Sequence, residues 1–527
     1  MLKTTVNIVS IFSLVILTVV NGEIKAQTIT SRIDFTDKIR NWDGFGVNYV
    51  ETSQTYDYFE YPQDYGGFSI LEDEDKAEIL RLIFGEEGLK VNLVKMFLDP
   101  LHQNVEDGSY DHETSTENMR FFVRKGTEIS EERGQDLSII TTLYSPPGYM
   151  TVQGTIRGRD LDPDHEDDLI KYFIDWSQYL VENDYPLKFI SIHNEGESWL
   201  RWPESGKAAN TISEAGHDYN LFWTPKQVSN FIIKLRSALD TSKLNDVGIT
   251  NGEPTNWYRF GYWGYADALA DNEQALDALS IITSHGFYVG DQHKGRWFGP
   301  HSSYGTDQVR NQKPEIHAWA TSSSWDEKMP VCTEDGEIGK EYVMDAGFVK
   351  QIHGNIYEAK INGFIPWAVI QRAAHWQNPD PNPGSAFRVY EDGSWELKKA
   401  YYYYKQVTRA GQPGMSVVRT FSMDTEIALI GFASNGTQNA NSFVLINFGD
   451  KQKDVKITIN GNKEDFFDAF RTSGQEVYRR YNSAKNELMG ENFVSIGSFQ
   501  LNEGQSFLYS APANSVTTFF EKTKPFN

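Results

Sequence analysis

The sequence has a single cysteine and a shortage of basic residues. Cys332 is the one Cys among 527 residues, so the chain cannot form an internal disulfide, and its position in an apolar run favours burial over a role as a nucleophile. Asp and Glu number 73 against 49 Lys and Arg, which gives a formal net charge of −24. Because phosphate binding requires Lys and Arg, this balance argues against nucleic acid or an anionic membrane as a partner.

Several motifs with known chemistry are also missing. No glycine-rich phosphate loop and no Ser-centred nucleophile elbow stands at a strand-to-helix turn. The histidines are scattered, without the close spacing of zinc ligands. The acidic run at 162–168 could hold calcium, but a solvated helix start is the favoured interpretation. We therefore expect no metal and no cofactor.

The first 26 residues have the features of a signal peptide. Lys3 supplies a positive charge, residues 6–20 form an apolar core too short to span a membrane comfortably, and residues 20–22 or 24–26 offer a cleavage site. No cysteine lies there to carry a lipid. We expect an exported protein, periplasmic or extracellular, that does not insert into the membrane. No feature of the sequence indicates an oligomeric state.

Short apolar runs alternate with amphipathic segments and predict an α/β fold, a (β/α)8 TIM barrel, over residues 41–403. Buried parallel strands need not alternate polar with apolar residues, so continuous apolar runs are acceptable strands. The expected strands are 44–49, 91–97, 138–144, 189–193, 247–250, 279–283, 330–333 and 364–369. Helical stretches between them include 75–83, 167–181, 224–239 and 343–361.

The end of the chain differs in composition from the rest. All 13 tryptophans lie between Trp42 and Trp395, and after about residue 404 strand-like runs are separated by Gly, Asn and Asp. These features predict a C-terminal antiparallel β-sandwich domain over 404–527. A strand within 27–40 precedes the barrel, and we expect it to join the sandwich.

Two glutamates follow predicted strands four and seven. S-I-H-N-E ends at Glu195 and P-V-C-T-E ends at Glu334, a separation of 334 − 195 = 139 residues. That separation corresponds to about three strand-helix repeats of roughly 45 residues each. A carboxylate at the carboxyl end of a barrel strand is held by rigid backbone yet faces the cleft, where acid/base and nucleophilic chemistry take place.

A pair of carboxylates in this arrangement is typical of glycosidases. One acid protonates the leaving oxygen, and in retaining enzymes the second attacks the anomeric carbon from about 5 Å away. Asn194 could donate a hydrogen bond to a sugar 2-hydroxyl. Glu197 and Glu337 are expected in loops beyond the strand ends, because a strand advances about 3.3 Å per residue. Glu253, just beyond strand five, is the strongest rival acid.

A set of motifs in the same order resembles glycoside hydrolase family 30. In the barrel these are D-G-F-G at 43–46, Y-S-P-P-G-Y-M at 144–150, H-N-E at 193–195 and T-E at 333–334. In the tail, Y-Y-Y-Y-K-Q-V-T-R at 401–409, P-G-M at 413–415 and A-P-A-N-S-V-T-T-F at 511–519 resemble the link to the sandwich and its closing strand. The resemblance spans nearly the whole mature chain. Family 39 of the same superfamily shares the N-E and T-E pattern and is the main alternative.

The resemblance implies a role for each matching residue. Glu195 would be the acid/base and Glu334 the nucleophile of a retaining enzyme. His285 and Tyr288 after strand six would lie near the nucleophile, although H-G-F-Y differs from the usual His-x-Tyr of the family. Trp367 on strand eight would be a platform on which a sugar stacks, with a packed barrel tryptophan as the alternative.

Two further residues complete the expected substrate site. Tyr144 begins the second barrel motif and would line the site. On strand two the family usually carries an Arg, whereas this chain has Lys95. A lysine cannot make the same bidentate contact, so the subsite here is expected to differ from the family pattern.

The resemblance implies a secreted retaining β-glycoside hydrolase that acts on a β-linked oligo- or polysaccharide. The loop tryptophans favour a walled pocket and therefore an exo-acting β-xylosidase or β-glucosidase. These tryptophans are Trp199, Trp202, Trp257, Trp263 and Trp325. The alternatives are an endo-acting xylanase, β-1,6-glucanase or galactanase, and a non-catalytic carbohydrate-binding protein on a degenerate barrel.

Overall fold

The computed structural model describes residues 28–49, 66–197, 202–207, 220–287, 301–325, 341–372, 384–479 and 488–522. The predicted signal peptide lies outside the described residues, as do Tyr288, Cys332, Glu334 and Glu337.

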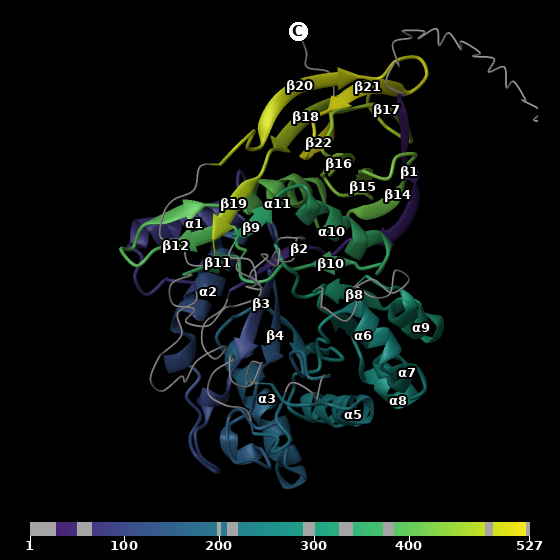
Figure 1. Cartoon of the computed structure of the whole chain (residues 1–527). Helices are drawn as coiled ribbons and strands as arrows, with labels where there is room; N and C mark the ends of the chain where they lie inside the picture. Colours follow the sequence, from purple (N-terminus) through teal and green to yellow (C-terminus); the bar gives the residue numbers. More distant parts are fainter. Residues whose placement is uncertain are drawn as a thin grey trace, which may run out of the picture.

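Eight parallel strands form the predicted barrel in the larger part of the molecule (Figure 1). In chain order they are β2 (Gly44–Asn48), β3 (Leu93–Leu98), β4 (Ser138–Leu143), β5 (Leu187–Ser191), β6 (Gly248–Ile249), β7 (Ile281–Ser284), β8 (His317–Ala320) and β10 (Gly363–Phe364). Their order in the sheet is β6-β5-β4-β3-β2-β10-β8-β7. A parallel bridge between Thr250 and Ile281 joins the two outermost strands, so the sheet closes on itself. This closure brings the carboxyl ends of all eight strands to one rim.

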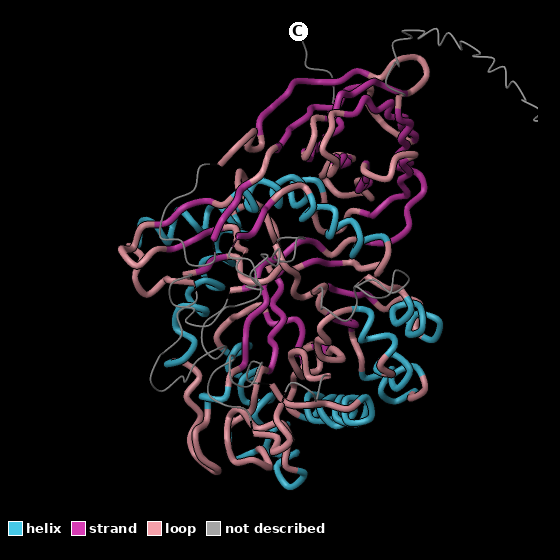
Figure 2. Tube along the Cα trace, in the orientation of Figure 1, coloured by secondary structure: helices cyan, strands magenta, loops and turns pink. Residues whose placement is uncertain are grey.

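Helices alternate with these strands and lie outside the sheet (Figure 2). They are α1 (Asp73–Phe84), α2 (Glu117–Glu132), α3 (Glu166–Glu182), α5 (Pro225–Thr241), α6 (Trp257–Tyr262), α7 (Tyr265–Ala270), α8 (Glu273–Ala278), α9 (Tyr304–Gln312) and α10 (Gly347–Tyr357).

Local sequence explains where the helices begin. Helix α5 starts with a capping box, in which the Thr224 hydroxyl accepts from the Gln227 amide at 3.2 Å and the Gln227 side chain accepts from the Thr224 amide at 2.9 Å. The acidic run at 162–168 likewise starts a helix, since it supplies three acids to the first turn of α3. Acids there interact favourably with the positive end of the helix dipole.

The seventh barrel strand differs from the prediction. β8 lies between β7 and β10, in the place that the sequence analysis gave to residues 330–333, which lie outside the described residues. The run H-A-W-A is short and starts with a polar residue, so it is a weak strand signal. Asp43 stabilises it, because its carboxylate accepts from His317 Nδ1 at 2.8 Å and from Trp319 Nε1 at 2.6 Å. Glu334 therefore follows strand seven by fourteen positions (334 − 320) and does not end it.

A nine-stranded, mostly antiparallel sheet forms the second part of the molecule, at the top of Figure 1. Its order is β20-β18-β22-β16-β15-β14-β1-β17-β21. The strands are β1 (Ile29–Asn41), β14 (Ser416–Ser422), β15 (Ile427–Ala433), β16 (Ser442–Asn447), β17 (Lys453–Asn460), β18 (Phe466–Ser473), β20 (Val494–Gln500), β21 (Ser506–Ala511) and β22 (Ser515–Lys522). The two edges of this sheet meet across an apolar core, since the rings of Phe499 and Phe507 lie 5.1 Å apart.

The N-terminal strand β1 belongs to this second sheet. It pairs antiparallel with β14 and parallel with β17, and Figure 1 shows it in purple beside the green β14. Its burial alternates over Ile33 to Phe35, both of which enter the core of the sheet. The chain therefore crosses from the sheet into the barrel between β1 and β2.

Helix α11 (Lys399–Ala410) lies between the two parts and spans the predicted boundary at 403 and 404. Its Tyr404 hydroxyl donates to the Gly46 carbonyl of β2 at 2.6 Å. Two residues further along, the Gln406 side chain accepts from the Thr518 hydroxyl of β22 at 2.5 Å. Buried hydrogen bonds in both directions fix the barrel against the sheet.

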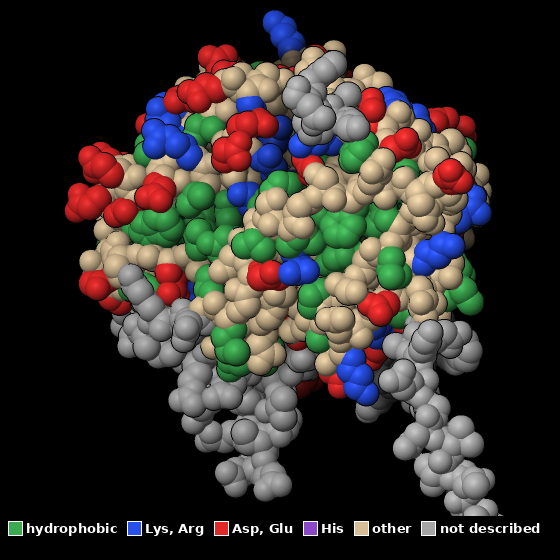
Figure 3. Space-filling model, turned by 90° about the horizontal axis from the view of Figure 1, so that it is seen from above, with side chains coloured by type: hydrophobic (Ala, Val, Ile, Leu, Met, Phe, Trp, Pro, Cys, Tyr) green, Lys and Arg blue, Asp and Glu red, His purple; other side chains and the backbone are tan. Residues whose placement is uncertain are grey.

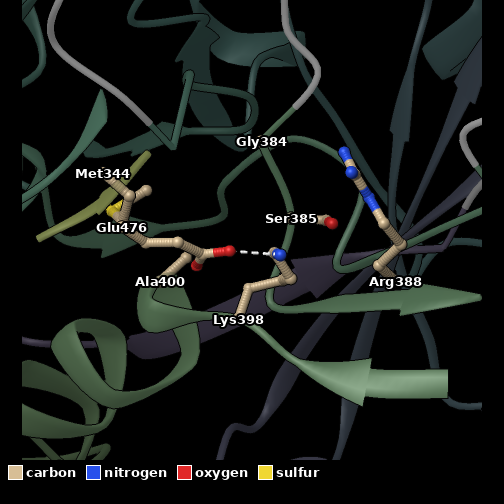
Figure 4. Close-up of a pocket in the computed structure, with 7 residues that line it drawn as sticks. All are labelled: Met344, Gly384, Ser385, Arg388, Lys398, Ala400 and Glu476. Atoms are coloured by element: carbon tan, nitrogen blue, oxygen red, sulfur yellow. Dashed lines mark ion pairs between the residues drawn. The ribbon is translucent and has the colours of Figure 1, made fainter. Parts of the chain in front are cut away.

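Smaller strands add a second connection between the two parts. β9 (Glu341–Met344) pairs with β19 (Glu476–Arg479), and β11 (Ile370–Gln371), β12 (Phe387–Val389) and β13 (Trp395–Leu397) form a three-stranded sheet. Between them lies a cavity of about 10 Å³, the space of a single water. Figure 4 shows that Lys398 and Glu476 point toward one another in it as an ion pair.

No helix among the described residues is long and apolar enough to cross a membrane. On the face of the molecule seen in Figure 3, Lys and Arg side chains are scattered among Asp and Glu side chains, and hydrophobic side chains lie between them.

Candidate active site

Side chains from four barrel strands meet at the carboxyl rim of the barrel. Lys95 comes from β3, Glu195 follows β5, Glu253 follows β6, and His285 is the first residue after β7. Hydrogen bonds and one ion pair connect all four. Two predicted site residues, Lys95 and His285, therefore lie beside the predicted acid/base Glu195.

Glu195 is held by unusual backbone geometry. Its φ is +46°, a left-handed conformation that residues with a side chain rarely adopt and that costs about 1–3 kcal/mol. Its amide donates to the Glu253 carbonyl at 2.7 Å, and the Glu253 amide donates to the His193 carbonyl at 2.9 Å. These two bonds join the ends of strands four and five. They fix the direction of the Glu195 side chain. About a tenth of the surface of this residue is exposed to solvent.

Glu253 is the centre of the network and is fully buried. One carboxylate oxygen accepts from the Thr142 hydroxyl of β4 at 2.6 Å. The other accepts from Lys95 Nζ in a short ion pair and contacts His285 Nε2 at 2.8 Å. Burial alone would raise the pKa of Glu253, but the Lys95 charge and the His285 hydrogen bond hold it well below its ordinary value.

This environment removes Glu253 from the list of candidate acids. A carboxylate that is ionised, buried and saturated with donors neither gives up a proton nor reaches a substrate. The sequence analysis named Glu253 as the strongest rival of Glu195. Thr142, the third donor to Glu253, was missed, because a Thr within a strand such as S-I-I-T-T-L carries no signal of its own.

His285 connects the buried carboxylate to the exposed one. Its Nε2 lies 2.8 Å from a Glu253 oxygen and 3.5 Å from Lys95 Nζ, while its Nδ1 lies 3.0 Å from a Glu195 oxygen. Asn194 also belongs to this group, since its side-chain oxygen accepts from Lys95 Nζ at 3.3 Å. The predicted role of Asn194 toward a sugar hydroxyl is not tested by this contact.

Tyr144 and Trp367 both lie next to the Phe97 ring. The Phe97 ring of β3 is 4.8 Å from the Tyr144 ring and 6.4 Å from the Trp367 indole, and Lys95 Nζ is 5.3 Å from its centre. Both side chains are buried, with Trp367 at 5% exposure. Trp367 Nε1 has no hydrogen-bond partner in the described part of the chain. An indole N–H in that state is a donor that a ligand or a water can satisfy.

The end of strand seven carries hydroxyls where the resemblance places a carboxylate. Thr321, Ser322 and Ser323 follow β8 and are fully buried. Their side-chain oxygens have no hydrogen-bond partner among the described residues. Glu334 belongs to the same connection, which leaves the carboxyl end of β8 at the rim of the barrel, but it lies outside the described residues.

The neighbouring glutamate Glu197 has a structural partner. Its carboxylate accepts from Arg259 Nη1 at 2.8 Å and from the Thr255 amide at 3.1 Å, and its side chain is buried. The Arg259 guanidinium stacks on the Trp263 ring at 4.5 Å. Glu197 thus lies in a loop beyond the end of β5, as expected, but it is buried, and the pair ties this loop to helix α6.

Three of the loop tryptophans are packed inside the protein. Trp202, Trp257 and Trp325 are buried, and Trp257 Nε1 donates to Asn355 at 3.2 Å. Trp263 is exposed, at 37%, and Trp199 lies outside the described residues. Three of these five tryptophans are thus packed inside the protein, and exo action stays a prediction. Large side chains in the loops complete the barrel core, as aromatic residues do when their polar atoms find partners.

Burial lowers the pKa of His193 to about 4, against the opposing effects of Glu197 and Glu253. His193 therefore stays neutral two positions before Glu195. Elsewhere on the described chain, Glu106, His165 and Asp168 lie close enough to hold a metal, but they are partly or fully exposed on the surface.

Comparison with known proteins gives matches in structure but not in sequence. No family model matches the chain, and no curated protein matches it. A family 30 subfamily 8 xylanase from Clostridium acetobutylicum superposes with a TM-score of 0.63 at 16% identity, over 94% of this chain and 100% of that chain. Xylanase C of family 30 from Talaromyces cellulolyticus gives 0.64 at 14% identity, over 94% and 100%.

An endo-β-1,6-glucanase gives a TM-score of 0.62 at 14% identity, over 94% of each chain. These values confirm the fold that the motifs predicted, a (β/α)8 barrel with a β-rich second part arranged as in family 30 structures. The similarity covers nearly the full length of both partners, so the whole architecture is shared and not the barrel alone.

Proposed function

We propose that the protein is a secreted hydrolase of β-glycosidic bonds that acts by double displacement, with Glu195 as the acid/base and Glu334 as the nucleophile. The observation that carries the proposal is the position of Glu195. It follows strand four of a family 30-like barrel, its backbone is fixed, and Nδ1 of His285 contacts its carboxyl group at 3.0 Å.

The reaction needs one carboxylic acid that is protonated and one that is ionised. Glu334 would attack the anomeric carbon while Glu195 protonates the departing oxygen, and Glu195 would then accept a proton from the incoming water. Glu334 is supported by its place in the connection that leaves the carboxyl end of β8. The hydroxyls of Thr321, Ser322 and Ser323, which have no partner in the described ranges, and the Trp367 indole would bind sugar hydroxyls at that rim.

For the substrate we propose internal cleavage of a β-linked polysaccharide, in place of the exo-acting β-xylosidase or β-glucosidase first expected. Of the five tryptophans that suggested a closed pocket, Trp202, Trp257 and Trp325 are buried in the protein. Structures with the same fold include xylanases and an endo-β-1,6-glucanase, and these activities set the first substrates to test.

A non-catalytic carbohydrate-binding protein is the second candidate. It is favoured by one observation, the absence of a carboxylate at 321–323, directly after strand seven. A barrel that binds glycans without cleaving them would keep the sugar-binding rim and lose one acid.

One experiment separates the two candidates. The wild-type protein is incubated with xylan, a β-1,6-glucan, a β-galactan and a panel of aryl β-glycosides, beside Glu195→Gln, Glu334→Gln and the exposed control Glu273→Gln. The proposal predicts oligosaccharide products, loss of activity in the first two variants and normal activity in the control. Wild-type turnover in either of the first two variants contradicts the assignment. Binding without any product in the wild type favours the second candidate.

A further inference from the structure

Glu253 has no role in the chemistry proposed above, yet it is among the most elaborately held carboxylates of the described chain. Donors reach it from three strands, namely Lys95 of β3, Thr142 of β4 and His285 after β7. Its side chain and that of Lys95 have no exposed surface. Burying an ion pair costs desolvation energy, which frequently exceeds the gain in stability, so stability alone gives little reason to keep this one.

The hydrogen-bond pattern restricts the position of the protons. Lys95 keeps Glu253 ionised, so the Glu253 oxygen at 2.8 Å can only accept from His285 Nε2, which must carry a proton. In a neutral imidazole the other nitrogen, Nδ1, is then an acceptor. Nδ1 faces Glu195 at 3.0 Å, and two acceptors at that distance repel one another. A proton on Glu195 removes the repulsion and forms a hydrogen bond.

We propose that Glu253 is a positioning residue that fixes His285 as the Nε2–H tautomer and thereby keeps a proton on Glu195. The inference rests on the proposed function, because it assigns to Glu195 the protonated state that a general acid needs. In the first step the proton leaves Glu195 for the departing oxygen. In the second step the Nδ1 lone pair beside the ionised Glu195 favours uptake of a proton from water, which restores the starting state.

The other charged groups around His285 agree with this tautomer. Lys95 Nζ lies 3.5 Å from Nε2 and has no acceptor to offer to the Nε2 proton, which is therefore left to Glu253. His193, which also interacts with His285, has a pKa lowered to about 4 by burial and is neutral. The Phe287 ring, 5.3 Å from the imidazole, carries no charge. Among the described groups, Glu195 is thus the one neighbour that can supply a proton to Nδ1.

The test uses the double variant Lys95→Met/Glu253→Gln, because removal of Glu253 alone strands a buried lysine. Lys398→Met/Glu476→Gln is the matched control, since it removes a buried Lys–Glu pair that lines the small cavity described above (Figure 4). In the test variant a glutamine side chain can donate to Nε2 as well as accept from it, so the tautomer is no longer fixed. His285 can then donate from Nδ1 and stabilise the ionised form of Glu195.

The first readout is independent of activity. Histidine labelled with ¹⁵N in the full-length protein gives two-bond correlation spectra in which the His285 signal is identified by its loss in His285→Gln. We expect the Nε2–H pattern in the wild type and the control at pH 7, and a change toward Nδ1–H in the test variant. An Nδ1–H or doubly protonated His285 in the wild type would overturn the inference. So would a test variant in which His285 keeps the wild-type Nε2–H pattern.

The second readout is catalytic and compares two leaving groups. A phenyl glycoside needs protonation of its leaving oxygen and a 2,4-dinitrophenyl glycoside does not. For the test variant we expect kcat/KM on the phenyl glycoside to fall by roughly 10- to 100-fold, a loss no larger than the rate enhancement that a general acid supplies. The alkaline limb of the pH profile of kcat/KM should move to lower pH. The dinitrophenyl glycoside should change by less than about threefold. Equal losses on both substrates would overturn the inference.

The two proposals fail in different ways. If the wild type cleaves no glycoside, the proposed function fails, while the histidine spectra still decide the tautomer. If Glu195→Gln is inactive but the test variant behaves as the control does, the proposed function stands and the role of Glu253 is refuted.

Discussion

Replacing Glu253 by glutamine should destabilise the barrel strongly, because it leaves a buried positive charge without its partner. The Lys95 and Glu253 side chains are both fully buried. Removing one member of a buried pair costs about 3–5 kcal/mol. We expect the lower end of this range, near 3 kcal/mol, because the Asn194 oxygen at 3.3 Å and the new glutamine oxygen can still accept from Lys95.

The same reasoning predicts that a second substitution restores stability. In Lys95→Met/Glu253→Gln no charge remains in the interior, and replacement of a buried pair by neutral groups is often neutral or stabilising. The double variant should therefore lie within about 1 kcal/mol of the wild type. For a barrel of about 360 residues with an unfolding entropy of about 2.1 cal/mol/K per residue, 3 kcal/mol corresponds to a fall in Tm of about 4 °C.

Tryptophan fluorescence is the suitable probe, because all 13 tryptophans lie between Trp42 and Trp395 and the sandwich domain contains none after that point. Urea unfolding followed by this signal reports the barrel and leaves the second sheet largely silent. The reasoning is refuted if Glu253→Gln loses less than about 1 kcal/mol, or if the double variant is as unstable as the single one.

Three further predictions follow from other groups in the barrel. Burial lowers the pKa of His193 to about 4 and that of His301 to about 3, both below the ordinary 6.5, so the unfolded chain takes up protons first as the pH falls. As the pH falls from 6.5 to 4, each histidine should lower the free energy of unfolding by up to about 3 kcal/mol. Urea unfolding at a series of pH values measures this loss, and a free energy of unfolding that does not change in this window would contradict the prediction. Asp43 lies at the opposite end of the barrel from the site, and Asp43→Asn should lower the free energy of unfolding by about 1.5–3 kcal/mol by weakening its two hydrogen bonds to β8. It should leave kcat unchanged. A lower kcat under conditions in which the variant is fully folded would contradict this prediction. Arg259→Met should leave Glu197 buried without its positive partner and lower stability by about 3–5 kcal/mol. It should also loosen the loop after Glu195, which would be visible as faster amide exchange at 195–197.

Much of the fold follows from local sequence. The apolar runs predicted the positions of barrel strands one to six to within a few residues, because a strand that is buried on both faces needs no other signal. Strand seven was misplaced because H-A-W-A depends on a long-range partner, Asp43, for its two polar side chains. The predicted helix at 343–361 begins too early, because residues 341–344 form β9 with a strand more than 130 positions away, at 476–479.

The candidate site was predictable in part for the same reason. Glu195, Asn194 and His285 each follow the end of a strand closely, where position alone brings them to one rim, and Lys95 is the third residue of β3. What they do there depends on contacts between residues about 90 to 190 positions apart, which no local pattern encodes. Sequence thus named Glu253 as a competing acid, whereas the geometry makes it a buried acceptor.

The position of the second carboxylate relative to strand seven was hard to predict for a similar reason. The Thr-Glu pair at Glu334 was assigned to strand seven, and the structure gives that strand to β8, followed by hydroxyl-bearing residues. Glu334 stays a prediction that depends on its connection to the same rim.

Azide rescue of Glu195→Ala tests the central claim most directly. A 2,4-dinitrophenyl glycoside of the preferred sugar needs no acid to form the glycosyl-enzyme, and azide can occupy the space of the missing carboxylate and attack without a base. We predict that turnover is restored by azide and that NMR shows a β-glycosyl azide, the product of two inversions at the anomeric carbon. An α-glycosyl azide would make Glu195 the nucleophile, and turnover at the wild-type rate without azide would remove it from the reaction.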